Sequence, residues 1–481
     1  MRRTDQLGVD LPSVTGCTHD SRAVRPGDLY AALPGAHAHG AQYLDQAVRS
    51  GAVAVLTDVA GAELAATRTG SPVPVLVAAD PRAVLGKTAS WVHGDPSRRL
   101  QVLGVTGTNG KTTTAFLLEA GLREAGLQTA LLGTVVTRIG EDVAASTRTT
   151  PEATDLHALF AVMVERGTQA VAMEVSSHAL ALGRVDGVLF DGAVFTNLSQ
   201  DHLDFHASLA DYFAAKASLF TPERTRRALV DVDDAHGRLL AASPQVPTTT
   251  YGEDGQWRAT GVQLRPDGST FRLHGPGLDP AGVTASVRLP GAFNVSNALA
   301  ALACLADAGV PLDTAVRGVA ALDGVPGRME RVDVGQPFTA LVDYAHTPDA
   351  VATLLSTVRS LTSGRVLVVL GCGGDRDRGK RPLMGRAAVD GADLAVLTSD
   401  NPRGEDPAAI LAEMAQPGAV LETDRRAAIE LAVREARPGD VVVVAGKGHE
   451  TGQETAGVVA PFDDREVLRA VLQVAAVDDR R

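Results

Sequence analysis

The chain has 481 residues, which at roughly 150 residues per domain suggests about three domains. Hydrophobic residues make up 45% and charged residues 21%, values typical of a soluble globular protein, so collagen-like or wholly disordered architecture is excluded. Lys and Arg total 45 and Asp and Glu total 57, so the net charge is −12. This charge argues against nucleic acid or an anionic membrane as a partner.

Two features of the sequence predict a cytoplasmic protein. No stretch approaches the roughly 18 apolar residues needed to span a bilayer, and residues 1–6 lack the apolar core of a signal peptide. The cysteines Cys17, Cys304 and Cys372 are far apart and form no C-x-x-C pair, as expected in a reducing compartment. We expect a cytoplasmic monomer whose partners are small molecules.

The first segment, residues 1–97, contains short apolar runs separated by turn residues. Ala52–Leu56 and Val73–Val77 are two of these runs, and His93–Ser97 reads as a linker.

From Leu100 the pattern changes to a strand, a glycine loop and a helix. Gln101–Val105 is apolar and β-branched, Gly107–Gly110 is the loop, and Thr112–Ala125 predicts a helix that ends before Gly126. Further short strands are expected at Ala170–Met173 and Ala193–Phe195. Such alternation predicts a mainly parallel sheet flanked by helices.

Two breaks interrupt the rest of the chain. Residues 253–290 are rich in Gly, Pro and Asp and predict an antiparallel insertion, which a helix over Val295–Asp307 follows. A second break at Gly324–Gly327 precedes a new α/β pattern. Its expected strands are Thr339–Val342, Val366–Leu370, Leu394–Leu397 and Val441–Val444, and its expected helices include Asp349–Leu361 and Arg425–Ala436.

The glycine loop has the composition of a phosphate-binding loop. Between a strand and a helix, the backbone N–H groups of Gly107–Gly110 would hold phosphates, Lys111 would reach the terminal phosphates, and Thr112 would bind Mg²⁺. The strict pattern requires glycine at position 105, where Val stands, so the loop is a variant.

Polar residues that could bind a ligand follow the strands of the central segment. Glu174 ends the run Ala170–Met173, and a carboxylate at the end of a strand beside a phosphate loop is often a metal ligand. The stretches Val175–His178 and Asp201–His206 add Ser, His and Asp. Any one of these residues by itself is typical of a solvated or structural position, so the prediction depends on their clustering.

A series of motifs in chain order resembles those of the Mur ligase family, ATP-dependent enzymes that build the cytoplasmic precursor of peptidoglycan. The motifs are Thr106–Thr112, Met173–His178, Asn197–Asp204, Ala215–Lys216, Gly291–Asn297, Gly327–Glu330, Asp343–Pro348, Gly371–Arg376, Asp400–Arg403 and Gly446–Glu450. The resemblance implies an α/β protein of three domains. They are a small uridine-binding domain (1–97), a central P-loop ATPase-type domain with a mainly parallel sheet (98–329), and a Rossmann-like amino-acid-binding domain (330–481).

The resemblance also implies the reaction. The motifs look most like those of family members that join meso-2,6-diaminopimelate to the D-glutamate side chain of UDP-N-acetylmuramoyl-L-alanyl-D-glutamate. The γ-phosphoryl group of ATP passes to the carboxylate, the amine attacks the resulting acyl phosphate, and phosphate leaves. Such chemistry needs charge neutralisation and positioning more than covalent help from the protein.

The resemblance assigns ATP and the metal to the central segment. The ATP-binding residues would be Gly107, Thr108, Asn109, Gly110, Lys111, Thr112 and Thr113, with Asn294, Arg328 and Asp343 near the adenine and ribose. The ligands of Mg²⁺ would be Thr112, Glu174, His202 and Lys216, the last carbamylated by CO₂. The catalytic residues would be Lys111, Glu174, His202 and Lys216. From the sequence alone, Lys216 reads as an ordinary lysine of an amphipathic helix.

Contacts to the UDP-linked substrate are likewise implied by the resemblance. Ser21, in a loop over residues 20–29, is the candidate for uridine, and the muramoyl-dipeptide contacts would be Thr149, Thr150, Ser176 and Arg184. Some family members carry Gln two residues before this arginine, whereas Leu182 stands here, so that contact is lost or replaced.

Selection of the amino acid is assigned to the last segment. The diaminopimelate-binding residues would be Arg376, Asp400, Asn401, Pro402, Arg403, Gly446 and Glu450. Diaminopimelate differs from lysine by a carboxylate at its far end, for which Arg403 offers a planar fork, and Glu450 suits the distal ammonium. A lysine-adding enzyme would avoid such an unpaired buried cation.

Three alternatives remain at this point. A ligase that adds lysine to the same precursor is disfavoured by Arg403. Folylpolyglutamate synthetase shares the phosphate loop and the amide-forming chemistry, but residues 20–29 and Asp400–Arg403 disfavour it. A P-loop nucleotide switch or binding module would need no amino-acid pocket.

Overall fold

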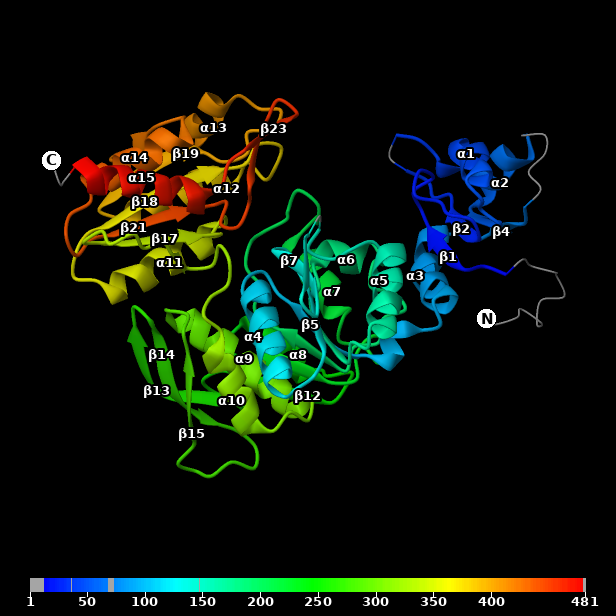
Figure 1. The fold of residues 1–481 in the computed structure, drawn as a ribbon, viewed down its shortest axis with the longest axis horizontal. Helices are drawn as coiled ribbons and strands as arrows, with labels where there is room; N and C mark the ends of the chain where they lie inside the picture. The colour runs from blue at the N-terminus through cyan, green and yellow to red at the C-terminus, as the bar shows by residue number, and fades with distance from the viewer. Residues whose placement is uncertain (1–12, 36, 68–72, 147, 479–481) are drawn as a thin grey trace.

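The computed structural model describes residues 13–35, 37–67, 73–146 and 148–478, and it contains three regions of mainly parallel sheet in chain order (Figure 1). This is the α/β organisation that the sequence predicts. The N-terminal region lies on the right of Figure 1, the central region in the middle, and the C-terminal region at the upper left. Among the described residues, no helix combines the length and the apolar character needed to cross a membrane.

The N-terminal region is a four-stranded parallel sheet in the order β1-β2-β3-β4. Its elements are β1 (Gly16–Thr18), β2 (Asp28–Ala31), α1 (Leu44–Arg49), β3 (Ala54–Thr57), α2 (Val59–Ala66), β4 (Val75–Val77) and α3 (Pro81–Val92). The segment predicted as a linker is instead packed: Pro96–Arg99 forms a 3-10 helix in which Pro96 and Ser97 are buried. The Ser97 hydroxyl accepts a hydrogen bond from Leu189 N (3.3 Å), which anchors this segment to the central region.

The central region is an eight-stranded sheet in the order β12-β11-β10-β5-β9-β6-β7-β8, in which the β6-β7 and β7-β8 pairs are antiparallel and the other pairs are parallel. The strands are β5 (Gln101–Thr106), β6 (Thr129–Leu132), β7 (Val136–Ile139), β8 (Asp142–Ala145), β9 (Ala170–Glu174), β10 (Gly192–Phe195), β11 (Ala228–Asp231) and β12 (Thr248–Tyr251). The helices are α4 (Lys111–Glu124), α5 (Ala153–Glu165), α6 (Ser177–Ala181), α7 (Leu209–Ala217) and α8 (Ala235–Ala242).

The inner strands β5, β6, β9 and β10 of the central sheet are buried on both faces, as their successive apolar residues predict. Leu103 and Ala172 point to the face covered by α4 and α9 (Ala292–Asp307), whereas Val102 and Val171 point to the face that packs against α5 and α7. Helices therefore cover both faces of the sheet at β5 and β9, the strands that end in the glycine loop and in Glu174.

The predicted antiparallel insertion is present as a separate three-stranded sheet. It consists of β13 (Arg258–Arg265), β14 (Gly268–His274) and β15 (Val283–Val287), and it packs on the side of α9 and α10 (Leu312–Ala321) (Figure 1).

The C-terminal region is a six-stranded sheet in the order β16-β17-β21-β18-β19-β20, with an antiparallel β16 at its edge. The strands are β16 (Glu330–Arg331), β17 (Thr339–Asp343), β18 (Val366–Cys372), β19 (Leu394–Ser399), β20 (Val420–Leu421) and β21 (Val441–Ala445). The helices are α11 (Pro348–Leu361), α12 (Lys380–Gly391), α13 (Pro407–Met414), α14 (Arg425–Glu435) and α15 (Asp464–Asp478). A hairpin of β22 (Gly452–Thr455) and β23 (Val458–Pro461) lies beside this sheet.

Candidate active site between the central and C-terminal regions

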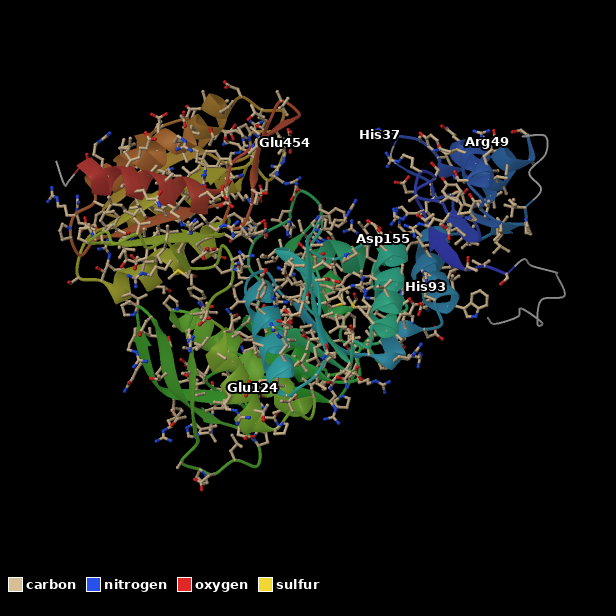
Figure 2. All side chains as sticks on the ribbon, viewed as in Figure 1. His37, Arg49, His93, Glu124, Asp155 and Glu454 are labelled. Carbon is tan, nitrogen blue, oxygen red and sulfur yellow. The ribbon has the colours of Figure 1, made fainter. Side chains whose placement is uncertain are left out.

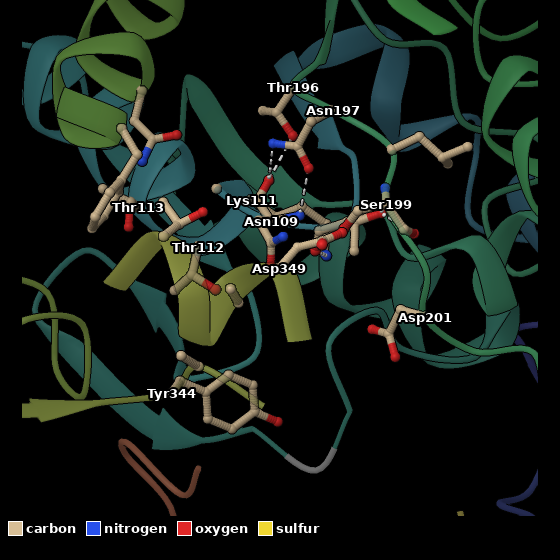
Figure 3. Close-up of a pocket in the computed structure, with 18 of the residues that line it drawn as sticks. Asn109, Lys111, Thr112, Thr113, Thr196, Asn197, Ser199, Asp201, Tyr344 and Asp349 are labelled. Carbon is tan, nitrogen blue, oxygen red and sulfur yellow. Dashed lines mark hydrogen bonds between the residues drawn. The ribbon is translucent and has the colours of Figure 1, made fainter. Parts of the chain in front are cut away.

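The glycine loop connects β5 to α4 and is held in place by the segment that follows β10. Gly107 (φ 151°) and Gly110 (φ 85°) adopt backbone conformations that favour glycine. Asn197 accepts from Thr108 N (2.9 Å, backbone O) and from Asn109 N (2.9 Å, Oδ1), and the Thr196 hydroxyl donates to Asn109 O (2.6 Å) (Figure 3). The loop is therefore a rigid turn at the N-terminus of α4.

Lys111 lies within this loop. Its Nζ donates to Gly107 O (2.9 Å) and to Thr108 O (2.8 Å), so the ammonium lies at the mouth of the turn. Burial lowers the pKa of Lys111, while the negative charges of Glu174 and Asp201 raise it. A polyanion bound at the loop would stabilise the charged form further.

Glu174, at the end of β9, is almost fully buried and fully hydrogen-bonded. It accepts from the Thr112 hydroxyl (3.0 Å), from Thr134 N (2.7 Å) and from the Thr134 hydroxyl (3.0 Å). These donors hold the carboxylate beside the first turn of α4 and leave no positively charged partner among them. The geometry suits a carboxylate that binds a cation together with the Thr112 hydroxyl.

A second carboxylate of the site, that of Asp201, lies between two histidine side chains. His202 has a left-handed backbone (φ 55°), and its ring Nε2 is 3.4 Å from Asp201 Oδ2, while His346 of the C-terminal region is 3.9 Å from the same oxygen. Burial lowers the pKa of His202. Burial opposes ionisation of Asp201, but the neighbouring His346 and His202 outweigh it and lower the pKa of the carboxyl group.

Lys216, in the last turn of α7, is only 1% exposed. Its Nζ donates to Gly107 O (2.7 Å) and lies 4.4 Å from the centre of the Tyr212 ring, whose hydroxyl is 3.2 Å from Thr108 Oγ1. Burial, followed by repulsion from Lys111, lowers the pKa of Lys216 well below its usual range. A buried lysine beside a phosphate loop is unlike the surface residue that a helix pattern alone predicts.

A cavity of about 410 Å³ joins these groups and extends to the C-terminal region. Arg328 closes one side: its Nη2 donates to the Thr112 hydroxyl (3.0 Å), and its guanidinium carbon lies 4.3 Å from the centre of the Tyr344 ring. The sequence-predicted residues that line it are Thr108, Asn109, Gly110, Lys111, Thr112, Thr113, Thr149, Glu174, Ser176, His202, Lys216, Arg328 and Asp343. The strand ends and the interdomain boundary thus enclose one site.

Three other predicted contacts lie outside the lining of this cavity. Gly107 lies behind the two lysines of the site: its carbonyl oxygen accepts hydrogen bonds from the ammonium groups of Lys111 and Lys216. The Asn294 amide donates to Pro290 O (2.8 Å) and accepts from Asn297, and Asn297 lines the cavity in its place. Thr150 accepts from Ser176 N (3.1 Å) and donates to Glu174 O (2.9 Å), so it supports the site from behind.

Arg184 and Ser21 lie towards the N-terminal region. Arg184 donates to Thr150 O (3.4 Å) and pairs with Glu152 at 2.9 Å, while Leu182 ends α6 without a polar side chain in that position. Ser21 is buried in the N-terminal region, where its hydroxyl donates to Gln46 Oε1 (3.4 Å).

The residues predicted for amino-acid recognition form a separate group in the C-terminal region. Asn401 donates to Glu450 Oε2 (2.8 Å), and the buried Lys447 donates to both of them at 3.1 Å. Arg403 (φ 54°) donates to Gly374 O (2.8 Å) and lies 3.6 Å from Glu454 of β22. Asp400 lies against Gly446, because a Cβ added to Gly446 would be 2.7 Å from Asp400 Oδ2. Pro402 directly follows Asn401 in the chain. The Arg376 side chain donates a hydrogen bond to the backbone carbonyl of Asp375. None of the predicted residues in this group lines the cavity described above.

Several cavity residues were not singled out in the sequence. Asn197 and Asp201 belong to the motif Asn197–Asp204, and Tyr344 and His346 belong to the motif Asp343–Pro348. Membership of these motifs is the sequence feature that could have identified them as site residues. Thr134 follows β6 and holds Glu174, but no local pattern marks it. Contacts of this kind arise only when strands distant in sequence lie side by side.

The donor set fits a hard cation that also binds a phosphate. Thr112 and Glu174 offer oxygens 3.0 Å apart at the loop, and Asp201 and His202 lie on the same cavity. Across the part of the chain that the structure describes, no group of three or more His, Cys, Asp or Glu side chains is arranged to hold a metal by itself. Mg²⁺, which keeps waters and takes phosphate oxygens as ligands, matches such a sparse set.

Comparisons with known proteins give the same assignment for all three regions. In chain order, residues 13–90 match the family described as "Mur ligase family, catalytic domain", residues 105–305 match "Mur ligase middle domain", and residues 327–448 match "Mur ligase, glutamate ligase domain".

Individual relatives cover nearly the whole chain. A Streptomyces coelicolor protein named UDP-N-acetylmuramoyl-L-alanyl-D-glutamate--2,6-diaminopimelate ligase is 57% identical, and the match covers 98% of this chain and 95% of the relative. A solved structure with the same name is 34% identical with a TM-score of 0.68 and covers 96% and 95% of the two chains. A folylpolyglutamate synthase from Mycobacterium tuberculosis (20% identity, TM-score 0.60) covers 76% of this chain and 93% of its own, which shows a shared fold.

Proposed function

Because the chain belongs to the Mur ligase family, we propose that it joins meso-2,6-diaminopimelate to the D-glutamate side-chain carboxylate of UDP-N-acetylmuramoyl-L-alanyl-D-glutamate at the expense of ATP. It is an ATP-dependent ligase of peptidoglycan precursor synthesis, and we place it in the cytoplasm as a monomer. The observation that carries the proposal is the cavity in which the glycine loop, Glu174 and Lys216 face Arg328 and Asp343.

The glycine loop and Lys111 provide the phosphate-binding part of the reaction. Backbone N–H groups at the start of α4 and the Lys111 ammonium would hold the β- and γ-phosphates, and Arg328 adds a second cation from the C-terminal side. Asp343, whose carboxylate accepts from Met329 N and Ala345 N (both 2.8 Å), is held rigidly near the ribose position that the family resemblance implies.

Thr112 and Glu174 would hold Mg²⁺, and His202 belongs to a second metal position. The ion would neutralise charge on the phosphates when bound. Thr134 keeps the Glu174 carboxylate turned towards Thr112 by two hydrogen bonds, so little reorganisation is needed when the cation arrives.

Lys216 is chemically suited to carbamylation by CO₂. Only the neutral amine attacks CO₂, forming an N–C bond and releasing a proton, and the low pKa of Lys216 favours that form. Carbamylation replaces a buried cation, beside Lys111, by an anion with two oxygens, which removes the repulsion between the two lysines.

Selection of the amino acid rests on Arg403 and Glu450, with Arg376 nearby. Arg403 is held by Gly374 O and by two backbone hydrogen bonds to the β22 hairpin, from its own N to Glu454 O and from Ala456 N to its own O. This anchoring holds a planar cation that suits a distal carboxylate, whereas Glu450, which accepts from Asn401 and Lys447, would offer its carboxylate to the distal ammonium. The alternative, a lysine-adding ligase, would leave Arg403 without a partner from the substrate.

The proposal is tested by ADP release from the full-length enzyme with ATP, Mg²⁺ and the UDP-linked dipeptide. We expect turnover with meso-diaminopimelate and at least about tenfold lower kcat/KM with L-lysine, since one charged hydrogen-bonded pair is worth about 1.5–3 kcal/mol. Equal or better turnover with lysine would contradict the choice of amino acid.

The same assay examines the role of Arg403. Arg403→Ala should lower kcat/KM for diaminopimelate by more than about tenfold and leave the KM for ATP unchanged. The exposed Arg434→Ala, on α14, is the matched control and should behave as the wild type. An unaltered KM for diaminopimelate in Arg403→Ala would remove Arg403 from the site.

A further inference from the structure

Lys447 is a buried cation among the residues proposed to recognise the amino acid. It follows β21, and its side chain is 0% exposed. Its Nζ donates to Asn401 Oδ1 and to Glu450 Oε2, both at 3.1 Å. Because the Lys447 side chain is enclosed by protein, it can act on a ligand only through these two partners.

Lys447, Asn401 and Glu450 form a closed ring of hydrogen bonds, because the Asn401 amide also donates to Glu450 Oε2 (2.8 Å). An ammonium group only donates and a carboxylate only accepts, so Asn401 must turn its oxygen to Lys447 and its NH₂ to Glu450. Glu454 of β22, labelled in Figure 2 at the edge of the C-terminal region, donates its backbone N–H to the same Asn401 oxygen (3.0 Å). The direction of every bond in the ring is therefore fixed.

The ring holds one oxygen of Glu450 and leaves the other open. Both donors meet on Oε2, the side chain is 32% exposed, and Oε1 accepts no hydrogen bond from the residues that the structure describes. Lys447 and Glu450 together carry no net charge, so the attraction of a further cation depends on how closely it approaches Oε1. The orientation of this carboxylate is therefore decisive for recognition of an ammonium group.

The backbone around the ring is placed by other groups. Arg425, a buried residue of α14, donates to Ser399 O (3.1 Å) and to Ala445 O (2.9 Å). These carbonyls end β19 and β21, the strands that lead into the recognition residues. Loss of the Lys447 ammonium should therefore release the Glu450 side chain and leave both strand ends in place.

We propose that Lys447 is a positioning residue for the distal ammonium of diaminopimelate: it holds Glu450 Oε2 and so leaves Oε1 for that ammonium. The inference rests on the proposed function, since it takes diaminopimelate as the substrate and Glu450 as its partner. A lysine that only supported the fold would affect every amino-acid substrate alike. The two roles differ in whether the effect of a substitution depends on the distal ammonium.

The test compares two amino acids in the ADP-release assay of the full-length enzyme. They are meso-diaminopimelate and 2-aminopimelate, which keeps both carboxylates and lacks the distal ammonium. Lys447→Met should raise the KM for meso-diaminopimelate about tenfold, the lower end of what a hydrogen bond to a charged group contributes. The KM values for 2-aminopimelate and for ATP should stay at those of the wild type. Lys87→Met, at an exposed position on α3, is the matched control and should change none of them.

A double variant keeps the test decisive if Lys447→Met folds poorly. Removal of one member of a buried charge pair leaves the other without its partner, whereas Lys447→Met combined with Glu450→Gln removes both charges. If Lys447 acts through Glu450, the double variant should discriminate between the two amino acids no less and no more than Glu450→Gln alone. Thermal melting of each variant shows whether it is folded.

Each outcome has a separate meaning. Equal rises in KM for both amino acids in Lys447→Met, or a double variant with a higher KM for meso-diaminopimelate than Glu450→Gln, would overturn the positioning role while the proposed function stands. Equal KM values for the two amino acids in the wild type would remove Glu450 as the partner of the distal ammonium, and the role of Lys447 with it. No turnover of meso-diaminopimelate by the wild type would instead refute the proposed function itself.

Discussion

At the scale of single residues, the site depends on how a few charged groups are held. Glu174 and Lys216 are buried and Lys111 is half-buried, and each is fixed by neutral hydrogen-bonding groups and not by an ion pair at hydrogen-bonding distance. Such groups remain available to a charged ligand, because binding does not first have to break a salt bridge. The neutral residues that hydrogen-bond to these charged groups therefore help to orient them, as Thr134 does for Glu174.

Thr134→Val tests this orientation. The substitution removes the hydroxyl that donates to Glu174 Oε2 and keeps the backbone N–H that donates to Oε1. We expect kcat to fall about tenfold and the Mg²⁺ concentration for half-maximal rate to rise, since a hydrogen bond to a charged group is worth about 1.5–3 kcal/mol. Thr137→Val, on β7, which removes a hydroxyl contact to Ser146, is the control. An unchanged Mg²⁺ requirement would show that the Thr134 hydroxyl does not orient Glu174.

Lys216→Ala tests the carbamate. Without a carboxylate at this position, activity should fall on the order of 100-fold, and short-chain carboxylic acids should restore part of it by supplying the missing oxygens. Lys87→Ala, at an exposed position on α3, should lose nothing and gain nothing from added acid. Full activity of Lys216→Ala without any added acid would refute the role.

At the scale of elements, turn residues decide where the helices of the site begin. The sequence predicts helices from Thr112 and Val295, whereas α4 begins at Lys111 and α9 at Ala292. In each case the helix starts directly after a glycine with positive φ, Gly110 (85°) or Gly291 (100°). A left-handed residue lets the chain turn sharply into a helix, so the glycine and not the first apolar residue marks the start.

Gly107→Ala should damage the loop specifically. A Cβ at Gly107 would lie 1.9 Å from the Thr196 hydroxyl, which holds the loop at Asn109 O. We expect the KM for ATP to rise at least about tenfold, because displacement of Thr196 releases the loop. Gly126→Ala is the matched control: this residue also has a positive φ (79°), but a Cβ there would meet nothing within 4 Å. It should lose only about 1 kcal/mol of stability and keep its affinity for ATP. Equal effects of the two substitutions on KM would contradict this account.

At the scale of the whole molecule, the active site is divided among regions that pack separately. The cavity joins the central and C-terminal regions through Arg328 and Tyr344, whereas Arg403 and Glu450 lie outside its lining. The chemistry requires the amine of the amino acid to reach the activated carboxylate. We therefore expect the C-terminal region to move towards the central region during the catalytic cycle, as is common in enzymes with several substrates.

The stability of the whole molecule should fall in mild acid through buried histidines. His157 on α5 is fully buried, its Nε2 is 2.9 Å from Asp186 O, and burial lowers its pKa to about 4. The unfolded chain takes up a proton near pH 6.5, where folded His157 stays neutral, so stability is full above that pH and is lost as the pH falls towards 4. The loss from this one group amounts to about 3 kcal/mol.

Thermal unfolding of the wild type and of His157→Gln between pH 7 and pH 4.5 measures this effect. The melting temperature of the variant should be lower at pH 7 and should fall less steeply with decreasing pH, because Gln does not titrate. His236→Gln, on a half-buried residue of α8, serves as the control and should keep the wild-type slope. Parallel slopes for wild type and His157→Gln would exclude His157 as a source of acid sensitivity.

The sequence by itself determined the α/β fold, the three-region organisation and most element positions. Apolar runs such as Gln101–Val105 and Val441–Val444 are local signals, and a strand buried on both faces needs no information from afar. The motifs also named most residues that line the cavity, because phosphate binding demands a particular loop at a particular place. The roles of those residues, and the domain boundaries at 97 and 329, stay predictions.

Only the tertiary structure decided which residues act on one another across these motifs. Lys216 reads as a surface lysine until α7 packs it against Gly107 O. Thr134 is an ordinary threonine until β6 lies beside β9, where its hydroxyl and N–H reach Glu174. Periodicity fixes the face on which a side chain lies, whereas its partners depend on sheet order and domain packing, which bring together residues far apart in the chain.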